Sequence, residues 1–295
     1  MRNYIVILSV AFFMMLPAGL AQEKPADTTA IRRATAVRIP NEQITIDGRL
    51  SEAAWKEAVP TAGFLQQNPD VGAAPTLTTE VRFVYDDDNL YVGTILSDPE
   101  PDKLIISDLK HDFFPRDNDA FMLILDTFHD RRNAYNFATN PMAAQREVQF
   151  YDDGRTQNQN WDAVWFVKTS VDETGWNVEM AIPFKSLRFP ETADQVWGLN
   201  MQRILQRKFE WDMWSPVPRQ YFLSKVSYAG ILEGIRGVQP GRNIRVKPFF
   251  LSQAKRDNSR RETNADSGVD LKMGLGSNLV LDVTYRTDFS QVEAD

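Results

Sequence analysis

The chain has 295 residues, and its hydrophobic content of 43% and charged content of 25% are those of an ordinary globular protein. This balance excludes an intrinsically disordered chain and a polytopic helical membrane protein. The net charge of -7 argues against nucleic acid as a partner, because phosphates repel an acidic surface. Cysteine is absent, so disulfides, thiolate metal sites and cysteine nucleophiles are excluded as well.

The N-terminus predicts an export signal over residues 1–21. Arg2 provides its positive end, residues 4–16 form an apolar run, and residues 19–21 offer a cleavage site of small side chains. The apolar run is short for a membrane span, and a helical anchor is the alternative interpretation. We therefore expect an exported protein, in which the polar and aperiodic residues 22–36 form a linker.

Residues 37–237 predict an all-β domain, an antiparallel β-sandwich. The expected strands cover residues 44–46, 79–84, 90–96, 120–125, 135–139, 163–170, 176–182 and 197–204. One short helix is expected between them, with Ser51 as its N-cap and Trp55 on its apolar face. Short strands at this spacing, without helical patterns between them, are typical of two packed antiparallel sheets.

Residues 238–295 show a different pattern, in which apolar and polar residues alternate. Val269 and Leu271 fall on one face of a strand, and Asp270 falls on the other. A turn at Ser277 and Asn278 leads into a second alternating strand over residues 279–285. Such strands are what an outer-membrane β-barrel requires, and a soluble hairpin is the alternative. Because a few strands cannot satisfy their backbone groups in lipid, we expect the barrel to continue beyond residue 295.

Aromatic side chains in polar loops suggest a sugar-binding site. Trp161 and Trp214 lie among amides and carboxylates, in residues 158–162 and 210–216. A sugar stacks its C–H face on an aromatic ring and forms hydrogen bonds through the hydroxyls at its edge. The alternative interpretation is that these rings close the open end of the sandwich.

Acidic residues suggest two other kinds of site. Asp86, Asp87 and Asp88 could hold calcium through oxygen ligands, although a β-turn explains them equally well. Calcium is the only cofactor that the sequence suggests. Paired carboxylates could hydrolyse a glycosidic bond, but no pair is visible from spacing alone. The candidates for such a pair are Asp117, Asp119, Asp126, Glu147, Asp152, Asp153 and Glu179.

An ordered set of segments resembles the family 9 carbohydrate-binding-like domains. The segments are residues 46–55, 85–93, 117–119, 125–128, 140–141 and 175–184, and the resemblance covers residues 37–237. Residues 286–295 are similar to the start of an uncharacterised outer-membrane barrel, which follows this domain in a larger family. The resemblance thus implies a β-sandwich followed by the first strands of an incomplete barrel at residues 238–295.

The resemblance implies a non-catalytic module that binds a glycan or oligosaccharide, in the service of carbohydrate catabolism. It places the protein in the outer membrane of a Gram-negative bacterium, with the sandwich in the periplasm or at the surface. Sugar-binding members hold the sugar between two tryptophans, and these positions fall near Arg116 and Tyr221. Together with the polar loops, the resemblance predicts ligand contacts from Trp161, Trp214, Tyr221, Asn140, Asp119 and Arg116. A barrel cap without sugar affinity, and part of an O-glycosyl hydrolase, are the alternatives.

Overall fold

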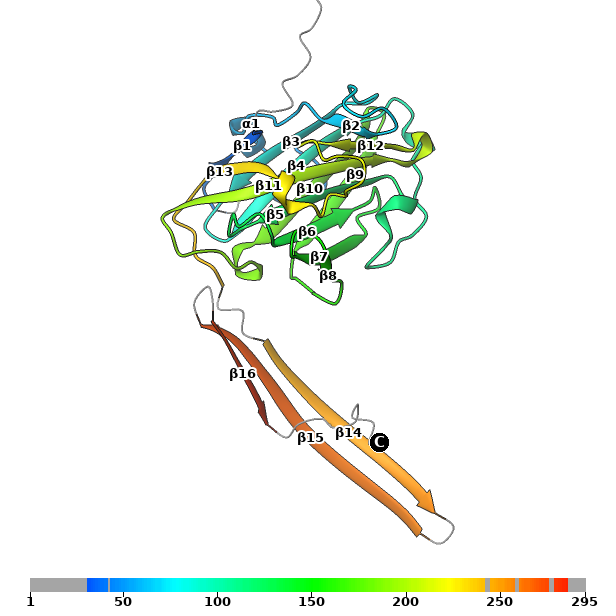
Figure 1. Ribbon diagram of the computed structural model, residues 1–295, viewed down its shortest axis with the longest axis vertical. Coiled ribbons are helices and arrows are strands. Elements are labelled where there is room, and N and C mark those ends of the chain that lie inside the picture. Colours follow the sequence, from blue (N-terminus) through cyan, green and yellow to red (C-terminus); the bar gives the residue numbers. More distant parts are fainter. Residues whose placement is uncertain (1–30, 42, 242–244, 258–259, 276–278, 286–295) are drawn as a thin grey trace, which may run out of the picture. The chain divides into compact units, whose positions relative to one another are not determined.

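The computed structural model describes residues 31–41, 43–241, 245–257, 260–275 and 279–285 (Figure 1). The predicted export signal and most of the predicted linker lie outside these residues, as do the turn at residues 277–278 and residues 286–295. No helix in the described part of the chain is both long enough and apolar enough to cross a membrane.

Two layers of β-strands pack face to face and form the body of the domain (Figure 1). The first layer contains, in spatial order, β8 (Thr156–Asn158), β7 (Gln145–Tyr151), β6 (Ala134–Thr139), β5 (Ala120–Asp126), β11 (Asp194–Leu205) and β13 (Gly230–Arg236), with β12 (Glu210–Met213) beside β11 and β2 (Leu65–Asn68) beside β12. The second layer contains β3 (Thr79–Tyr85), β4 (Asn89–Ser97), β10 (Gly175–Pro183) and β9 (Phe166–Asp172). The predicted β-sandwich is confirmed.

Strand β1 (Arg33–Arg38) connects the two layers. Residues 33–35 pair in parallel with β13 of the first layer, and residues 36–38 pair in parallel with β3 of the second. The strands therefore form one 13-stranded sheet that is folded on itself, and the sheet is mixed rather than purely antiparallel. β1 also begins inside the predicted linker, so the folded domain starts before residue 37.

The main core lies between the two layers. Phe121 and Leu123 of β5 point into it and are fully buried, as are the alternate apolar residues of β10. Met122 and Ile124 of β5 belong to a second apolar cluster, which also contains residues from the segment between β12 and β13. Because both of its faces are covered, β5 is apolar at nearly every position.

A third cluster surrounds α1 (Ala54–Glu57), a single helical turn against the second layer. Its N-cap residue is Ala53 and no side chain caps it, so the predicted cap at Ser51 is wrong. The strand predicted at residues 44–46 is absent as well. Ile44 packs in the cluster of Trp55, so packing against the helix explains its apolar character. The short 3₁₀ helices are η1 (Pro101–Lys103), η2 (Pro115–Asp117), η3 (Phe184–Ser186), η4 (Gln206–Lys208) and η5 (Val226–Tyr228).

A separate antiparallel sheet contains β14 (Arg245–Asp257), β15 (Arg260–Leu275) and β16 (Leu279–Tyr285). Its register aligns Val246, Leu271 and Val283 across the three strands, so these residues share one face. Lys247 and Asp270 lie opposite one another on the other face. The two strands predicted after residue 268 are confirmed, whereas the membrane barrel stays a prediction.

Candidate functional site

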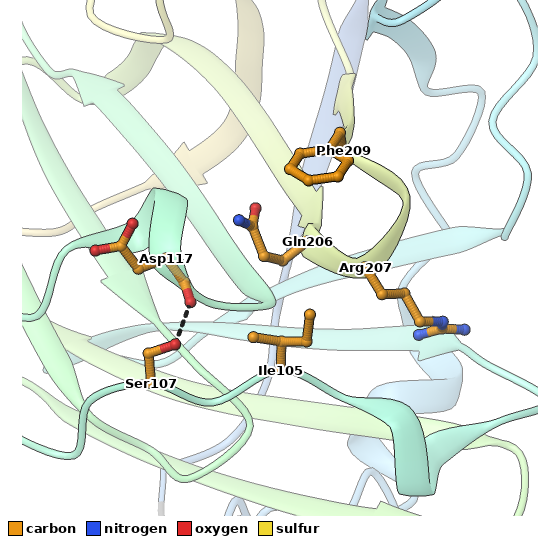
Figure 2. A pocket seen from close by; sticks show the side chains of 6 residues that line it. All are labelled: Ile105, Ser107, Asp117, Gln206, Arg207 and Phe209. Carbon is orange, nitrogen blue, oxygen red and sulfur yellow. Dashed lines mark hydrogen bonds between the residues drawn. The ribbon is translucent and has the colours of Figure 1, made fainter.

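A hollow of about 490 Å³ lies between the loop that precedes β5 and the turn that connects β11 to β12 (Figure 2). It is lined by Ile105, Ser107 and Asp117 from the loop, and by Gln206, Arg207 and Phe209 from the turn. A volume of this size accommodates one or two sugar rings. The hollow is therefore the candidate binding site of the domain.

Two buried side chains at the start of β5 hold the loop wall of the hollow. The Asn118 side chain accepts a hydrogen bond from the amide of Ser107 at 2.7 Å and donates one to the carbonyl of Phe114 at 2.9 Å. Asp119, which is only 1% exposed, accepts the amide of Ile105 at 2.6 Å. Burial raises the pKa of Asp119. The structure thus gives Asp119 a positioning role in place of the predicted contact with a sugar.

Asn140 has a similar role and no exposed surface. Its Nδ2 donates to the carbonyl of Asp108 at 2.8 Å, and its Oδ1 accepts the amides of Met142 and Ala144 at 3.0 and 3.1 Å. These bonds close the tight turn after β6 and fasten it to the loop of the hollow. The structure thus gives Asn140 a structural role, and its predicted contact with a ligand stays a prediction.

The turn wall of the hollow is anchored by an ion pair. Arg207 donates from Nη1 and Nη2 to the two carboxylate oxygens of Asp98, at 2.6 and 2.7 Å. Burial opposes the ionisation of Asp98, but the bonds from Arg207 outweigh it and lower the pKa of the carboxyl. A bidentate pair of this kind fixes the guanidinium and, through it, η4.

Phe209 is the exposed aromatic ring of the hollow. It is 70% exposed and its backbone φ is 51°, in the left-handed region that bulky residues avoid. Its carbonyl accepts a hydrogen bond from the side chain of Asn68, which fastens this conformation to β2. Backbone strain at a bulky exposed residue is typical of functional positions.

Two polar side chains of the hollow have no hydrogen-bond partner among the described residues. The carboxylate of Asp117 and the side-chain amide of Gln206 form no hydrogen bond with other described residues, while the Ser107 hydroxyl donates to the backbone carbonyl of Asp117 at 2.7 Å (Figure 2). The hollow therefore combines an aromatic face with an available carboxylate and an available amide. This is the arrangement that a sugar ring with hydroxyls at its edge requires.

Beside the hollow, Arg116 lies on two aromatic rings. Its guanidinium carbon is 4.1 Å from the centroid of the Phe222 ring and 4.9 Å from that of Trp211. We call these three residues the arginine stack. η2 provides Arg116 to the stack and Asp117 to the hollow, so the two surfaces are neighbours. Predicted residue Tyr221 precedes Phe222 and is 38% exposed.

The two predicted tryptophan platforms lie elsewhere. Trp214 is only 2% exposed, and its indole occupies the space beside Gly230, where an added Cβ would come within 2.7 Å of the ring. Trp161 packs at 4.9 Å from the ring of Tyr135, on the side of the main core. Neither lines the hollow, which agrees with the alternative that these rings close the sandwich. Of the predicted ligand residues, Arg116 lies beside the hollow, and Tyr221 precedes Phe222 of the arginine stack.

Two of the three aspartates considered for calcium have structural partners. Asp86 accepts the amides of Asp88 and Asn89 and the hydroxyl of Tyr91, and Asp87 pairs with Arg38. A calcium ion at this turn would have to displace these donors. The described residues contain no group of three acidic or histidine side chains arranged to hold a metal ion.

Several of the candidate carboxylates for hydrolysis are bound by donors of the fold. Glu147 is buried against the Trp165 indole, which donates to it at 2.9 Å, and Asp126 accepts the amide of Arg131 at 2.7 Å. Asp117 is the single carboxylate among the described residues that line the hollow.

Comparison with known proteins identifies the fold. The model of the carbohydrate family 9 binding domain-like family matches residues 46–209, more than half of the chain. The chain belongs to this family. The matched segment of the family 9 domain contains every residue that lines the hollow, whereas the aromatic members of the arginine stack follow it. A search of curated proteins found no match.

Solved structures share the fold of the family 9 domain at low sequence identity. A candidate carbohydrate-binding protein from Bacteroides uniformis is 9% identical with a TM-score of 0.58, over 70% of this chain and 100% of its own. A family 9 carbohydrate-binding module from Caldicellulosiruptor kristjanssonii, in complex with glucose, is 14% identical with a TM-score of 0.50, over 72% of this chain and 98% of its own. These similarities establish the architecture.

Sequence reasoning missed Phe209 and Gln206 as site residues. The sequence did offer one signal, a single aromatic residue within the polar run of residues 206–210. An isolated ring among polar residues indicates an exposed position in a turn and not a strand. The left-handed backbone at Phe209, whose ring lines the hollow, could not be predicted from the sequence pattern.

Proposed function

We propose that this family 9 domain binds a glycan without catalysis, at the hollow between Ile105 and Phe209. The observation that carries the proposal is the exposed ring of Phe209 beside the available Asp117 carboxylate and Gln206 amide. The ring stacks on the apolar face of a sugar, and the two polar groups bind its hydroxyls. The glucose bound by the module from C. kristjanssonii supports a sugar as the ligand.

The absence of a second carboxylate in the described lining of the hollow supports binding without hydrolysis, because hydrolysis of a glycosidic bond uses two carboxyl groups. The anchoring of both walls supports a preformed site. Asp119 and Asn118 fix the loop, and the Asp98–Arg207 pair fixes the turn. A rigid site loses little conformational entropy on binding.

Isothermal titration of the full chain with glucose and with cello-, xylo- and galacto-oligosaccharides tests the proposal. Phe209→Ala should abolish the binding heat, because the stacking face is removed. Phe166→Ala is the matched control, since Phe166 is 55% exposed and lies on β9, outside the hollow. The proposal fails if no sugar binds to the folded chain, or if Phe209→Ala binds as well as the parent.

We propose in addition that the domain is exported and carried by the outer membrane through β14–β16. The support is the predicted export signal together with the apolar face that these strands share. Val246 and Phe250 on β14 are 59% and 73% exposed, and Tyr285 on β16 is 64% exposed. An exposed apolar face opposite a charged one suits a lipid-facing barrel wall.

Two measurements address this second proposal. Expression in a Gram-negative host should give a mature protein that begins at Gln22, as determined by mass spectrometry. In detergent phase separation, the full chain should enter the detergent-rich phase, and Phe250→Asp should shift it toward the aqueous phase. Retention of residues 1–21, or a chain that stays in the aqueous phase, would argue against this assignment.

A further inference from the structure

Arg116 and Arg219 have no acidic partner among the described residues. The Arg116 guanidinium lies over the ring of Trp211. Arg219 donates to the side-chain oxygen of Asn68 at 2.6 Å, and Asn68 pairs with Trp211 across β2 and β12. Arg116 and Arg219 therefore contact neighbouring residues of the paired strands β12 and β2, whereas Arg207 is neutralised by Asp98.

The position of Arg116 is fixed by its surroundings. Rings of Trp211 and Phe222 contact its guanidinium, and the 3₁₀ turn that carries it is held by the side chain of Asn118. Stacking occupies the flat face of a guanidinium and leaves the N–H groups at its edge available. An oriented guanidinium with available N–H groups matches the planar oxygens of a carboxylate or the oxygens of a sulfate.

The charges around the hollow are separated. Asp117 lines the hollow and disfavours an anionic group there, whereas Arg116 and Arg219 lie outside its lining. Lys225 near Tyr221 is already paired with Asp153 and does not change this balance. A glycan bound in the hollow would therefore place hydroxyls at Asp117 and direct any negative substituent toward the two arginines.

We propose that the ligand is an acidic glycan, whose carboxylate or sulfate group is bound by Arg116 over Trp211 and by Arg219 beside Asn68. The inference rests on the glycan binding proposed above and adds the charge of the ligand and the residues that select it. Its chemical class is a polysaccharide that contains uronic acids or sulfate esters. The overall charge of -7 makes non-specific attraction to such a polymer unfavourable, so binding requires these local cations.

The experiment compares the affinities of charged sugars with those of their neutral counterparts. The full chain is titrated with a galacturonic acid trimer, with the methyl ester of the same trimer, and with a sulfated galactose oligomer. The acid should bind about tenfold more tightly than its ester, as expected for bonds to a charged group. Arg116→Gln and Arg219→Gln should each remove about tenfold of the affinity for the acid and leave the ester unaffected. Arg236→Gln is the matched control, because Arg236 is exposed and pairs with Asp194, at the end of β11 opposite the turn of the hollow.

The outcomes separate this inference from the proposed function. Tighter binding of either the trimer acid or the sulfated oligomer supports an acidic ligand, and the preferred one identifies the anionic group. The inference is overturned, while glycan binding stands, if the acid binds no tighter than its ester and the sulfated oligomer binds no tighter than neutral galacto-oligosaccharides. An equal loss of affinity in Arg236→Gln overturns it as well. If neither the charged sugars nor the neutral panel bind, both proposals fail. Thermal unfolding of each variant confirms that the comparison is made on folded protein.

Discussion

The indole N–H of Trp55 donates a 3.0 Å hydrogen bond to Oε1 of Glu179, which is buried on β10. Oε2 of the same carboxylate accepts the amides of Asp47 and Gly48, at 2.9 and 2.7 Å. The indole also lies against Gly93 of β4, the residue that pairs with Glu179. Three segments that resemble the family in sequence therefore meet at one carboxylate.

Glu179→Ala should lower the free energy of unfolding by about 3 kcal/mol, because it leaves three buried N–H donors without an acceptor. Urea denaturation measures the change. Glu57→Ala provides the control, since Glu57 is exposed on the adjacent helix and should alter stability by less than about 0.5 kcal/mol. Equal effects of the two substitutions would show that the carboxylate does not hold the segments together.

Gly93→Ala should cost about 1–3 kcal/mol through overpacking. A Cβ at this position would lie 2.8 Å from Cζ3 of Trp55 and 2.7 Å from Cδ2 of Leu50. In a Trp55→Phe background the smaller ring leaves more room, and the cost should shrink. A double-mutant cycle by urea denaturation checks this coupling, and an additive result would contradict the proposed contact.

A buried carboxyl group makes stability depend on pH. Both oxygens of Asp212 lack a donor among the described residues, and Arg203, which pairs with it across the strands, donates instead to Thr78 and Ser97. Burial, followed by the negative charge of Glu210, raises the pKa of Asp212 to about 8, although Arg203 opposes the shift. The folded protein thus retains a proton that the unfolded chain releases near its ordinary pKa of about 4.

Because the folded state binds more protons in this range, the free energy of unfolding should fall as the pH rises from about 4 to about 8. Asp212→Asn cannot titrate and should reduce this fall, as measured by urea denaturation at about pH 5.5 and about pH 8. Asp102→Asn, an exposed aspartate in η1, should leave the pH dependence unchanged. The same pH dependence in the parent and in Asp212→Asn would assign the proton to another group.

Phe209→Gly should separate stability from ligand binding. Glycine relieves the left-handed backbone at this position, which costs a bulky residue about 1–2 kcal/mol, so the variant should unfold at higher urea than Phe209→Ala. Both variants lack the ring and should lose glycan binding in titration calorimetry. If Phe209→Gly were the less stable of the two, the turn would not be strained.

The sandwich could be predicted from sequence because its central strands are long and its turns are marked. The strands around Leu123 and Val178 are apolar or alternating over their whole length. β1 could not be predicted, because it is short and its partners lie at residues 231–233 and 83–85. Parallel pairing with distant strands leaves no local signal in the sequence.

The site was harder to predict, because side chains of similar local sequence have different surroundings. Trp211 and Trp214 lie three residues apart in the same segment, yet Trp214 is buried beside Gly230 while Trp211 lies under Arg116. Asn140 and Asp119 lie in segments that resemble the family, but their side chains form hydrogen bonds with the backbone of a loop. Only the three-dimensional contacts distinguish a stacking ring from a core ring, or a ligand contact from a loop anchor.

The pairing of Arg33 with Ile231 has a consequence for biogenesis. An N-terminal strand that closes both layers must wait for β13 before it can dock, so the domain cannot complete its hydrogen bonding while that strand is still being synthesised or translocated. During that interval the edges of β1 and β11 that β13 later covers lack a neighbour, and an unpaired strand edge can pair with other chains. The order in which the strands are synthesised thus limits when the two layers can be joined.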